Sequence, residues 1–373
     1  YYYKCVSQMY KAVIAFTPGA AIAGGLMLGV ASLAHYVQCG KAVGASGLMR
    51  AFTHKKVSIE ERVGHLPFFG GLVTAAFWAM KLTLIPVGGY AFAQEQWRRV
   101  AAGVLIGVGS VAGNGCTSGH GLSGIGRLSL RSLVNTMVFM VSGAVTAIVT
   151  DTTGAFGISQ RTKTLDRVKW LTVDEFNLFS MIIGTGAIVA ATIAYASRKN
   201  LLPRTGKVAD AIRVLHEYAS GAFFGLGLCV GGMVNPMKVA AFLAFTKNSF
   251  DPSLMVLMAS ALAVLVPGYY FVKTKIERPT FHHMFAEPFK GITTKMLIGG
   301  TLFGAGWGLA GVCPGPLYVN FGAHIMNGSV FESGAIDMLL AFFVGQNLMR
   351  EFETLTSTGA SCEKKPPSSS ASK

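Results

Sequence analysis

The chain has 373 residues, of which 51% are apolar and only 13% are charged, against roughly 25% charged in an ordinary soluble domain. This composition excludes a disordered, collagen-like or disulfide-scaffold protein, and it argues against a soluble enzyme, whose surface needs polar side chains. The net charge of +15 lies mostly between apolar segments, as in loops at a membrane face, so we expect lipid and not nucleic acid as the partner of this surface.

Nine segments with little or no charge follow one another along the chain. A helix needs about 20 residues to cross the hydrocarbon core of a bilayer, so each is a candidate span, the last only if it extends back through Asp337 and Glu332. We therefore predict an all-α, polytopic, multi-pass integral membrane protein with about nine transmembrane helices. In chain order the segments are Ala12–Gly40, Phe68–Ala93, Val100–Gly126, Ser132–Thr150, Phe176–Ser197, Tyr218–Met237, Pro252–Val272, Met296–Phe331 and Met338–Met349.

A Gly-rich pattern recurs four times within these segments. Two copies, Leu105–Gly119 and Leu302–Pro316, carry two glycines and a cysteine at the same spacing. A third, Phe223–Val239, has Asn-Pro near the cysteine position, and the weakest, Met27–Gly47, has Cys39 one residue late. Such repeats are common in transporters, where discontinuous helices meet near the bilayer midplane.

The repeats divide one membrane domain, residues 1–353, into two pseudo-symmetric halves of about 12–175 and 205–350. Each half holds two units in which a long helix, a Gly-rich break and a short segment follow one another. The sequence leaves open whether the halves are inverted or parallel. Residues 354–373, rich in Ser, Lys and Pro, are predicted to be a disordered tail.

The breaks cannot be continuous membrane helices. Gly113–Gly124 contains five glycines among six polar residues, and Gly311–Pro316 contains two prolines, which lack backbone donors. Irregular backbone is tolerated at membrane depth only where it is buried in protein or lines a cavity. We therefore expect re-entrant half-helices whose N-termini, with free N–H groups and a positive dipole, suit an anion.

Polar residues in the breaks are the candidate substrate pathway. Four of them can offer hydrogen bonds or helix caps: Asn114, Thr117, Ser118 and Asn235. The glycines near them have a different interpretation, which is close packing between helices. His120 is a ligand contact, a proton relay or a satisfied polar residue. Lys238 either offsets an anion's charge or reaches the interface.

Cys116 and Cys313 occupy equivalent positions in two breaks. A thiol is a soft, polarizable group that suits a sulfur or selenium ligand better than a hard oxyanion. A buried cysteine is more often inert, which is our interpretation of Cys229. A metal site would need more ligands than two cysteines and one histidine, and no carboxylate pair or nucleotide motif supports catalysis, so we expect no enzyme, no metal and no cofactor.

The chain resembles the YeeE/YedE family of sulfur-transport membrane proteins. The resemblance is carried by Gly113–Gly121, by Asn235-Pro236 with Lys238, and by Gly306–Pro316, and it spans about residues 20–350. It implies thiosulfate uptake through an hourglass-shaped helical protein, with cysteines that hold the ion transiently through S–H···S contacts. Cys116 and Cys313 match those motif positions, and Cys39 is the nearest candidate for a third family cysteine.

The resemblance also implies a small soluble sulfur-carrier protein as a partner, as bacterial members often have. Three alternatives stay open at this point. The chain could transport another anion or a selenium species, with the cysteines as packing residues. It could be a membrane sulfur-transferase or thiol sensor, which would carry a persulfide on Cys116 or Cys313. A purely structural membrane scaffold is the last alternative.

Overall fold

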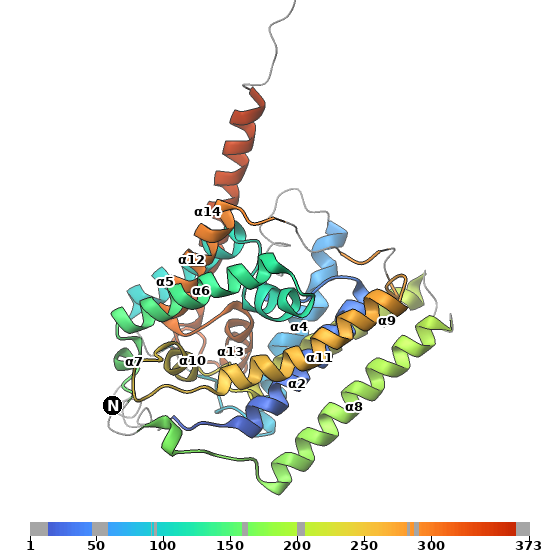
Figure 1. The fold of residues 1–373 in the computed structure, drawn as a ribbon, viewed down its shortest axis with the longest axis horizontal. Coiled ribbons are helices and arrows are strands. Elements are labelled where there is room, and N and C mark those ends of the chain that lie inside the picture. Colours follow the sequence, from blue (N-terminus) through green and yellow to red (C-terminus); the bar gives the residue numbers. More distant parts are fainter. Residues whose placement is uncertain are drawn as a thin grey trace, which may run out of the picture.

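The computed structural model describes residues 14–46, 59–90, 92, 95–158, 163–199, 206–281, 284–286 and 291–362. Their regular secondary structure is helical, apart from one isolated bridge between Phe16 and Val168 (Figure 1). The predicted all-α class is confirmed. The long helices are α2 (Pro18–Cys39), α4 (Ile59–Lys81), α5 (Gln96–Ala112), α6 (Leu130–Val149), α8 (Val173–Arg198), α9 (Lys207–Val230), α11 (Ser253–Lys275), α12 (Thr294–Ala310) and α14 (Ala335–Cys362); the short ones are η1 (Thr117–Gly124), α7 (Thr152–Ala155), η2 (Thr164–Asp166), α10 (Pro236–Leu243) and α13 (Pro314–Met326).

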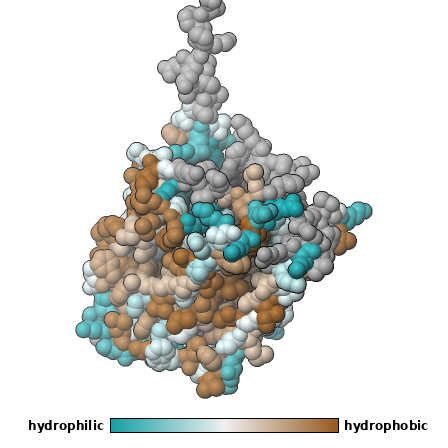
Figure 2. Space-filling model, turned by 45° about the vertical axis from the view of Figure 1, so that its right-hand side comes forward, coloured by the Kyte–Doolittle hydropathy of each residue, from teal (hydrophilic) through white to brown (hydrophobic). Residues whose placement is uncertain are grey.

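Within the described residues, five spans are long and apolar enough to cross a membrane. They are α2, α6, Val173–Ile193 of α8, α11, and the pair α12–α13, with α5 and η1 as a sixth, bent by 45°. Apolar side chains are exposed along α6 at every fourth residue from Met137 to Val149, a stripe suited to lipid. Figure 2 shows hydrophobic residues gathered in a broad area across the visible face. The structure thus supports several spans; the full count of nine stays a prediction.

Two boundaries differ from those expected. Helix α14 runs on to Cys362, beyond Glu353, because Thr354 and Thr356 bond back to carbonyls one turn earlier and Glu353 pairs with Lys295 at 2.7 Å. This helix covers the first part of the predicted tail, residues 354–362, and residues 363–373 lie outside the described part. Helix α8 occupies the stretch between the two predicted halves, and only 6% of its apolar window is buried.

The long helices pack in pairs that correspond between the two parts of the chain. Helix α2 packs parallel to α11, and α4 packs parallel to α9; likewise α5 packs parallel to α14, and α6 packs parallel to α12. The helices α2 and α9 run antiparallel, and so do α5 and α12. Figure 1 shows α2, α8 and α11 side by side, running in the same direction.

Glycines bring these helices into backbone contact. A Cβ added to Gly24 of α2 would lie 2.4 Å from the Gly231 nitrogen after α9, and one added to Gly299 of α12 would lie 2.2 Å from the Gly113 nitrogen after α5. No larger residue fits either position. The glycine pairs of the repeats also lie at close helix contacts. A Cβ added to Gly109, for example, would lie 2.3 Å from the Phe303 nitrogen. The packing interpretation of these glycines is confirmed.

Candidate functional site

Each of four long helices is followed by a break and then by a short helix. The breaks cover residues 40–44, 113–116, 231–235 and 311–313, and the helices after the last three are η1, α10 and α13. The first break leads into a helical turn at Ala45 and Ser46, where the described residues end. Gly and Pro cause the breaks: Gly40 and Gly311 end α2 and α12 in the left-handed conformation, and prolines open α10 and α13.

The four breaks converge in space. The Ala45 amide after the first break donates to Ser118 Oγ after the second at 3.1 Å. A Cβ on Gly315, after the fourth break, would lie 3.7 Å from Ala45 Cβ. Asn320 of α13 donates to the Val234 carbonyl of the third break at 2.9 Å. Segments that are far apart in the sequence therefore build one polar region inside the helix bundle.

Cys116 and Cys313 meet in this region. Each is the residue that precedes a short helix, and each has extended backbone. Both thiols are free and buried, and both belong to the same core cluster. Thr117 follows Cys116 directly as the first residue of η1, and Cys116 Sγ lies 3.1 Å from Ser118 Oγ. The structure therefore brings these four predicted residues together.

Tyr318 belongs to the same region, and sequence reasoning missed it. Its side chain is 0% exposed, packs edge-on against Phe69 with 5.2 Å between the ring centroids, and belongs to the same core cluster as Cys116 and Cys313. Its hydroxyl has no hydrogen-bond partner among the described residues. A buried hydroxyl without a partner is costly, so this group is available to a ligand beside the two cysteines. Its position on α13, five residues after Cys313, is the signal that could have revealed it.

His120 and Asn114 adjoin the cysteines in different ways. His120 is buried; its Nε2–H donates to the Gly113 carbonyl at 3.1 Å, and its Nδ1 accepts from Ser132 at 3.1 Å. Both ring nitrogens are thus used within the protein, which fits the satisfied-residue alternative. Asn114 is exposed and takes the left-handed conformation with φ 58°, so its backbone makes the turn of the second break.

Asn235 and Lys238 support the third break. Asn235 Oδ1 accepts from the Met237 amide at 3.0 Å, which confirms it as a helix cap. Lys238 forms an ion pair with Asp251 at 3.0 Å and donates to Thr17 and Ser253 at 2.6 and 3.0 Å. Its charge is therefore compensated inside the protein.

Cys39 lies elsewhere. It is the last residue of α2, before the first break, whereas Cys116 and Cys313 follow theirs. Its thiol donates to Glu217 Oε1 of α9 at 3.6 Å, and both residues are buried. Glu217 was missed because it stands one residue before an apolar segment.

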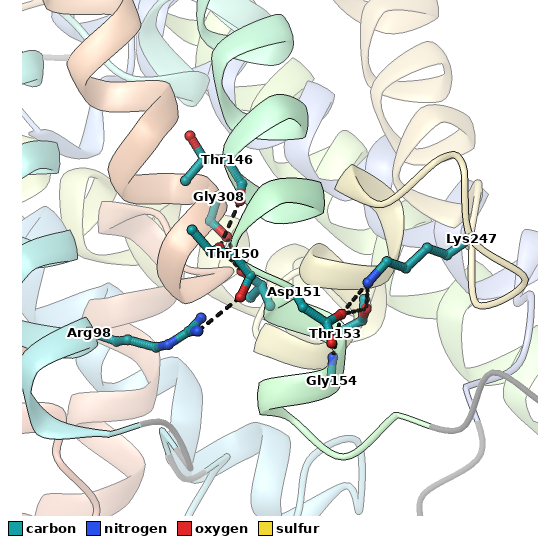
Figure 3. Close-up of polar contacts among 9 residues, drawn as sticks. Arg98, Thr146, Thr150, Asp151, Thr153, Gly154, Lys247 and Gly308 are labelled. Atoms are coloured by element: carbon teal, nitrogen blue, oxygen red, sulfur yellow. Dashed lines mark hydrogen bonds and ion pairs between the residues drawn. The ribbon is translucent and has the colours of Figure 1, made fainter.

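A polar cluster closes the opposite end of the bundle (Figure 3). Arg98 at the start of α5 donates to the Thr150 carbonyl at 2.9 Å, and Asp151 pairs with Lys247. Asp151 also caps α7 through the Gly154 amide. The hydrogen bond from Lys247 is the main cause that lowers the pKa of Asp151. A pocket lined by Glu95, Arg98, Thr150, Asp151 and Ala155 lies beside this cluster.

The described residues contain no group of three or more His, Cys, Asp or Glu side chains that could hold a metal ion. The polar region at the breaks offers instead soft sulfur, hydroxyl groups and helix N-termini. Such groups can bind an anion reversibly, and they lack the paired acid and base of hydrolytic chemistry.

Two kinds of known protein are similar to this chain. Residues 212–356 match a "Family of unknown function (DUF6691)". A "Probable transporter" of Xylella fastidiosa strain Temecula1 is 39% identical over 108 residues, which are 29% of this chain and 72% of that protein. A second "Probable transporter" of the same strain is 34% identical over 128 residues, 34% of this chain and 90% of that protein.

The apolar helices and these relatives together establish an integral, multi-pass membrane protein that functions in transport. Both relatives are named as transporters and not as enzymes.

Proposed function

The chain belongs to the family of these probable transporters, and on that premise we propose that it carries a small sulfur-containing anion, thiosulfate, past the paired thiols of Cys116 and Cys313. The observation that supports the proposal is the position of both cysteines directly before a short helix, each after a break, in the polar region where the breaks converge. Two thiols there would offer soft S–H donors to the sulfane sulfur of thiosulfate.

The surroundings suit an anion. The helices η1 and α13 begin directly after Cys116 and Cys313, so the positive ends of their dipoles lie beside the cysteines. In the first turn of α13, Gly315 carries the N–H, because Pro314 and Pro316 have none. Arg131 lies beside the second break, where its guanidinium reaches the Gly113 carbonyl at 3.5 Å. The Tyr318 hydroxyl adds a donor for a sulfonate oxygen. An oxyanion without a soft sulfur would use the amides and the hydroxyl but gain little from the thiols.

The two halves are related, in this proposal, by an inverted pseudo-twofold axis. Under this axis α2 corresponds to α9, α4 to α11, α5 to α12 and α6 to α14. The exchange turns each parallel helix pair into another parallel pair. In addition, α2 runs antiparallel to α9, and α5 runs antiparallel to α12. The cysteines precede η1 and α13, which correspond under this exchange. Such an arrangement would place them on opposite sides of the axis, as the constriction of a transport path needs.

Transport of sulfane-labelled thiosulfate into proteoliposomes tests the proposal. We expect uptake by the wild type and its loss in Cys116→Ala and in Cys313→Ala. Cys229→Ala is the matched control, because Cys229 is equally buried on α9 but lies outside the pair, and it should transport normally. Yield and melting temperature would show that each variant folds.

Each outcome decides between the alternatives. Uptake that persists in both cysteine variants would refute the thiol pathway, and equal competition by sulfate would favour a general anion transporter. Uptake of a selenium species without thiosulfate would change the substrate. A stable persulfide on Cys116 or Cys313, found by mass spectrometry without transport, would favour the transferase or sensor. A soluble sulfur-carrier protein would accept the ion after release.

A further inference from the structure

Cys39 and Glu217 form a second thiol site, which the paired cysteines do not use. The Cys39 thiol donates to Glu217 Oε1 at 3.6 Å, from the end of α2 to the third turn of α9. Only 2% of Cys39 and 7% of Glu217 is exposed. A carboxylate at this depth needs compensation, and within the described part of the chain the Cys39 thiol is its hydrogen-bond donor.

The charged groups around Glu217 come from the end of α2 and from the first half of α9. Arg213, one turn earlier on α9, and Lys41, just after α2, act on the carboxylate electrostatically, as does Cys39. His216 is buried next to Glu217, but its ring is used by Ser220 at 3.0 Å and by the Ala34 backbone. Helix α4, also packed on α9, carries His65 near this end. Glu217 is therefore a carboxylate whose neighbours include two cationic side chains and a thiol.

Two buried polar side chains on the same two helices have atoms without partners. Gln38, next to Cys39 on α2, is 0% exposed, and neither its amide nitrogen nor its amide oxygen has a hydrogen-bond partner among the described residues. The same holds for Arg213 Nε. Buried amides are normally satisfied, so this end of α2 has unused capacity to bind a small polar species.

The first break connects this pair to the candidate site. Five residues, 40–44, separate Cys39 from Ala45, whose amide bonds to Ser118 beside Cys116. The first break is therefore the chain segment that links Cys39 to the residues beside Cys116.

We propose that Glu217 is a proton-coupling site, which takes up one proton from solution when the transported anion accepts the hydrogen bond of Cys39. The proposal rests on the proposed function. One S–H cannot donate to two acceptors, so an anion that accepts the Cys39 hydrogen bond leaves the Glu217 carboxylate without its donor and next to a second negative charge. Protonation of Glu217 removes both penalties. The thiol keeps its own proton throughout, and no bond to sulfur forms or breaks.

The test compares binding and proton movement in wild type, Glu217→Gln and Glu353→Gln. Glutamine is nearly isosteric and accepts the Cys39 hydrogen bond, but it does not titrate in this range. Glu353 of α14 pairs with Lys295 of α12 and is a carboxylate at the same end of the bundle, with no thiol contact among the described residues. Thiosulfate affinity is measured by calorimetry between pH 5 and 8, and proton uptake by a pH dye in weakly buffered proteoliposomes.

One linked proton strengthens thiosulfate binding about tenfold for each pH unit of acidification, over the range in which Glu217 titrates. We expect this slope, and proton uptake with thiosulfate, in the wild type and in Glu353→Gln. Glu217→Gln should bind with an affinity that does not change with pH and should move thiosulfate without protons.

An unchanged pH slope in Glu217→Gln would overturn the coupling site, while thiosulfate transport by the same protein would leave the proposed function intact. Absence of thiosulfate binding in the wild type would instead refute the proposed function. If Glu217→Gln fails to fold, Cys39→Ala replaces it as the test. This variant lacks the S–H donor for which Glu217 and the anion compete. The pH dependence of thiosulfate affinity should therefore flatten if the coupling operates through the thiol. A wild-type slope in folded Cys39→Ala would refute the coupling.

Discussion

Lys238 Nζ lies 3.0 Å from Asp251 Oδ2, and the Asp251 side chain is completely buried. This pair joins α10, the short helix after the third break, to the start of α11. The Lys238 charge that the sequence assigns to the substrate pathway is thus committed to a buried carboxylate.

Breaking this pair should destabilise the protein. Lys238→Met leaves the Asp251 charge uncompensated, which we expect to cost about 3–5 kcal/mol, whereas replacing both residues by apolar ones should recover most of that loss. Chemical denaturation in detergent measures both. A Lys238→Met variant that keeps its stability but loses uptake would assign the lysine to the substrate instead.

Tyr318→Phe should separate binding from stability. The substitution removes one buried hydroxyl without a partner, so the ion-free protein should be as stable as the wild type or more stable. Thiosulfate affinity should fall roughly tenfold or more, because a hydrogen bond to a charged group contributes about 1.5–3 kcal/mol.

Tyr218→Phe provides the control for that experiment. Its hydroxyl bonds to Thr74 at 2.9 Å on an exposed side of the bundle, so thiosulfate affinity should stay the same. Equal affinities in Tyr318→Phe and wild type, measured by calorimetry, would remove Tyr318 from the anion site.

Two glycines of the break regions should respond oppositely to alanine. A Cβ on Gly299 would lie 2.2 Å from Gly113 N, whereas one on Gly119 would meet no atom within 4 Å. Gly299→Ala should cost about 1–3 kcal/mol through overpacking, and Gly119→Ala should be neutral or stabilise the protein by up to about 1 kcal/mol. Melting temperatures test the contrast, and similar losses in both variants would contradict the helix contact.

The Asp151–Lys247 pair should stabilise the fold in a pH-dependent way. Because the folded state lowers the pKa of Asp151, the stabilisation is present above the ordinary Asp range and is lost as pH falls through the lowered value. Asp151 is 62% exposed, so Asp151→Asn should cost at most about 1 kcal/mol near pH 7. Wild type and variant should converge in acid and in high salt; a difference that persists in acid would point to the α7 cap.

The helices and breaks could be predicted because their causes are local. Apolar length sets the helices, and Gly and Pro at 311–316 or Asn235-Pro236 interrupt them whatever lies nearby. The equal spacing of Cys116 and Cys313 within the repeats predicted that each would stand at a break before a short helix, as the structure has them. Whether the two thiols form one site stays a prediction.

Other parts depend on packing between distant segments. Glu217 and Asp251 stand directly outside charge-free segments and looked like loop residues, but α9 begins ten residues before Glu217, and the bundle buries both carboxylates. Tyr318 is significant only because Cys116 approaches it from another helix. No local pattern contains these relationships.

The helix directions have one more consequence, for topology. The ends of α2, α8 and α11 and the starts of α4, α9 and α12 lie at one face of the bundle. Basic residues outnumber acidic residues at this face. At the opposite face the numbers of basic and acidic residues are nearly equal. The basic residues on the first face include Lys41, Arg127, Arg131, Lys199, Lys207, Arg213, Lys273, Lys275, Arg278, Lys295 and Arg350. By the positive-inside rule, this face is expected in the cytoplasm, and a reporter fused after Cys362 should be active there. Cys39 and Glu217 then lie toward the cytoplasmic face, so the proposed protonation of Glu217 would respond to the pH of the cytoplasm.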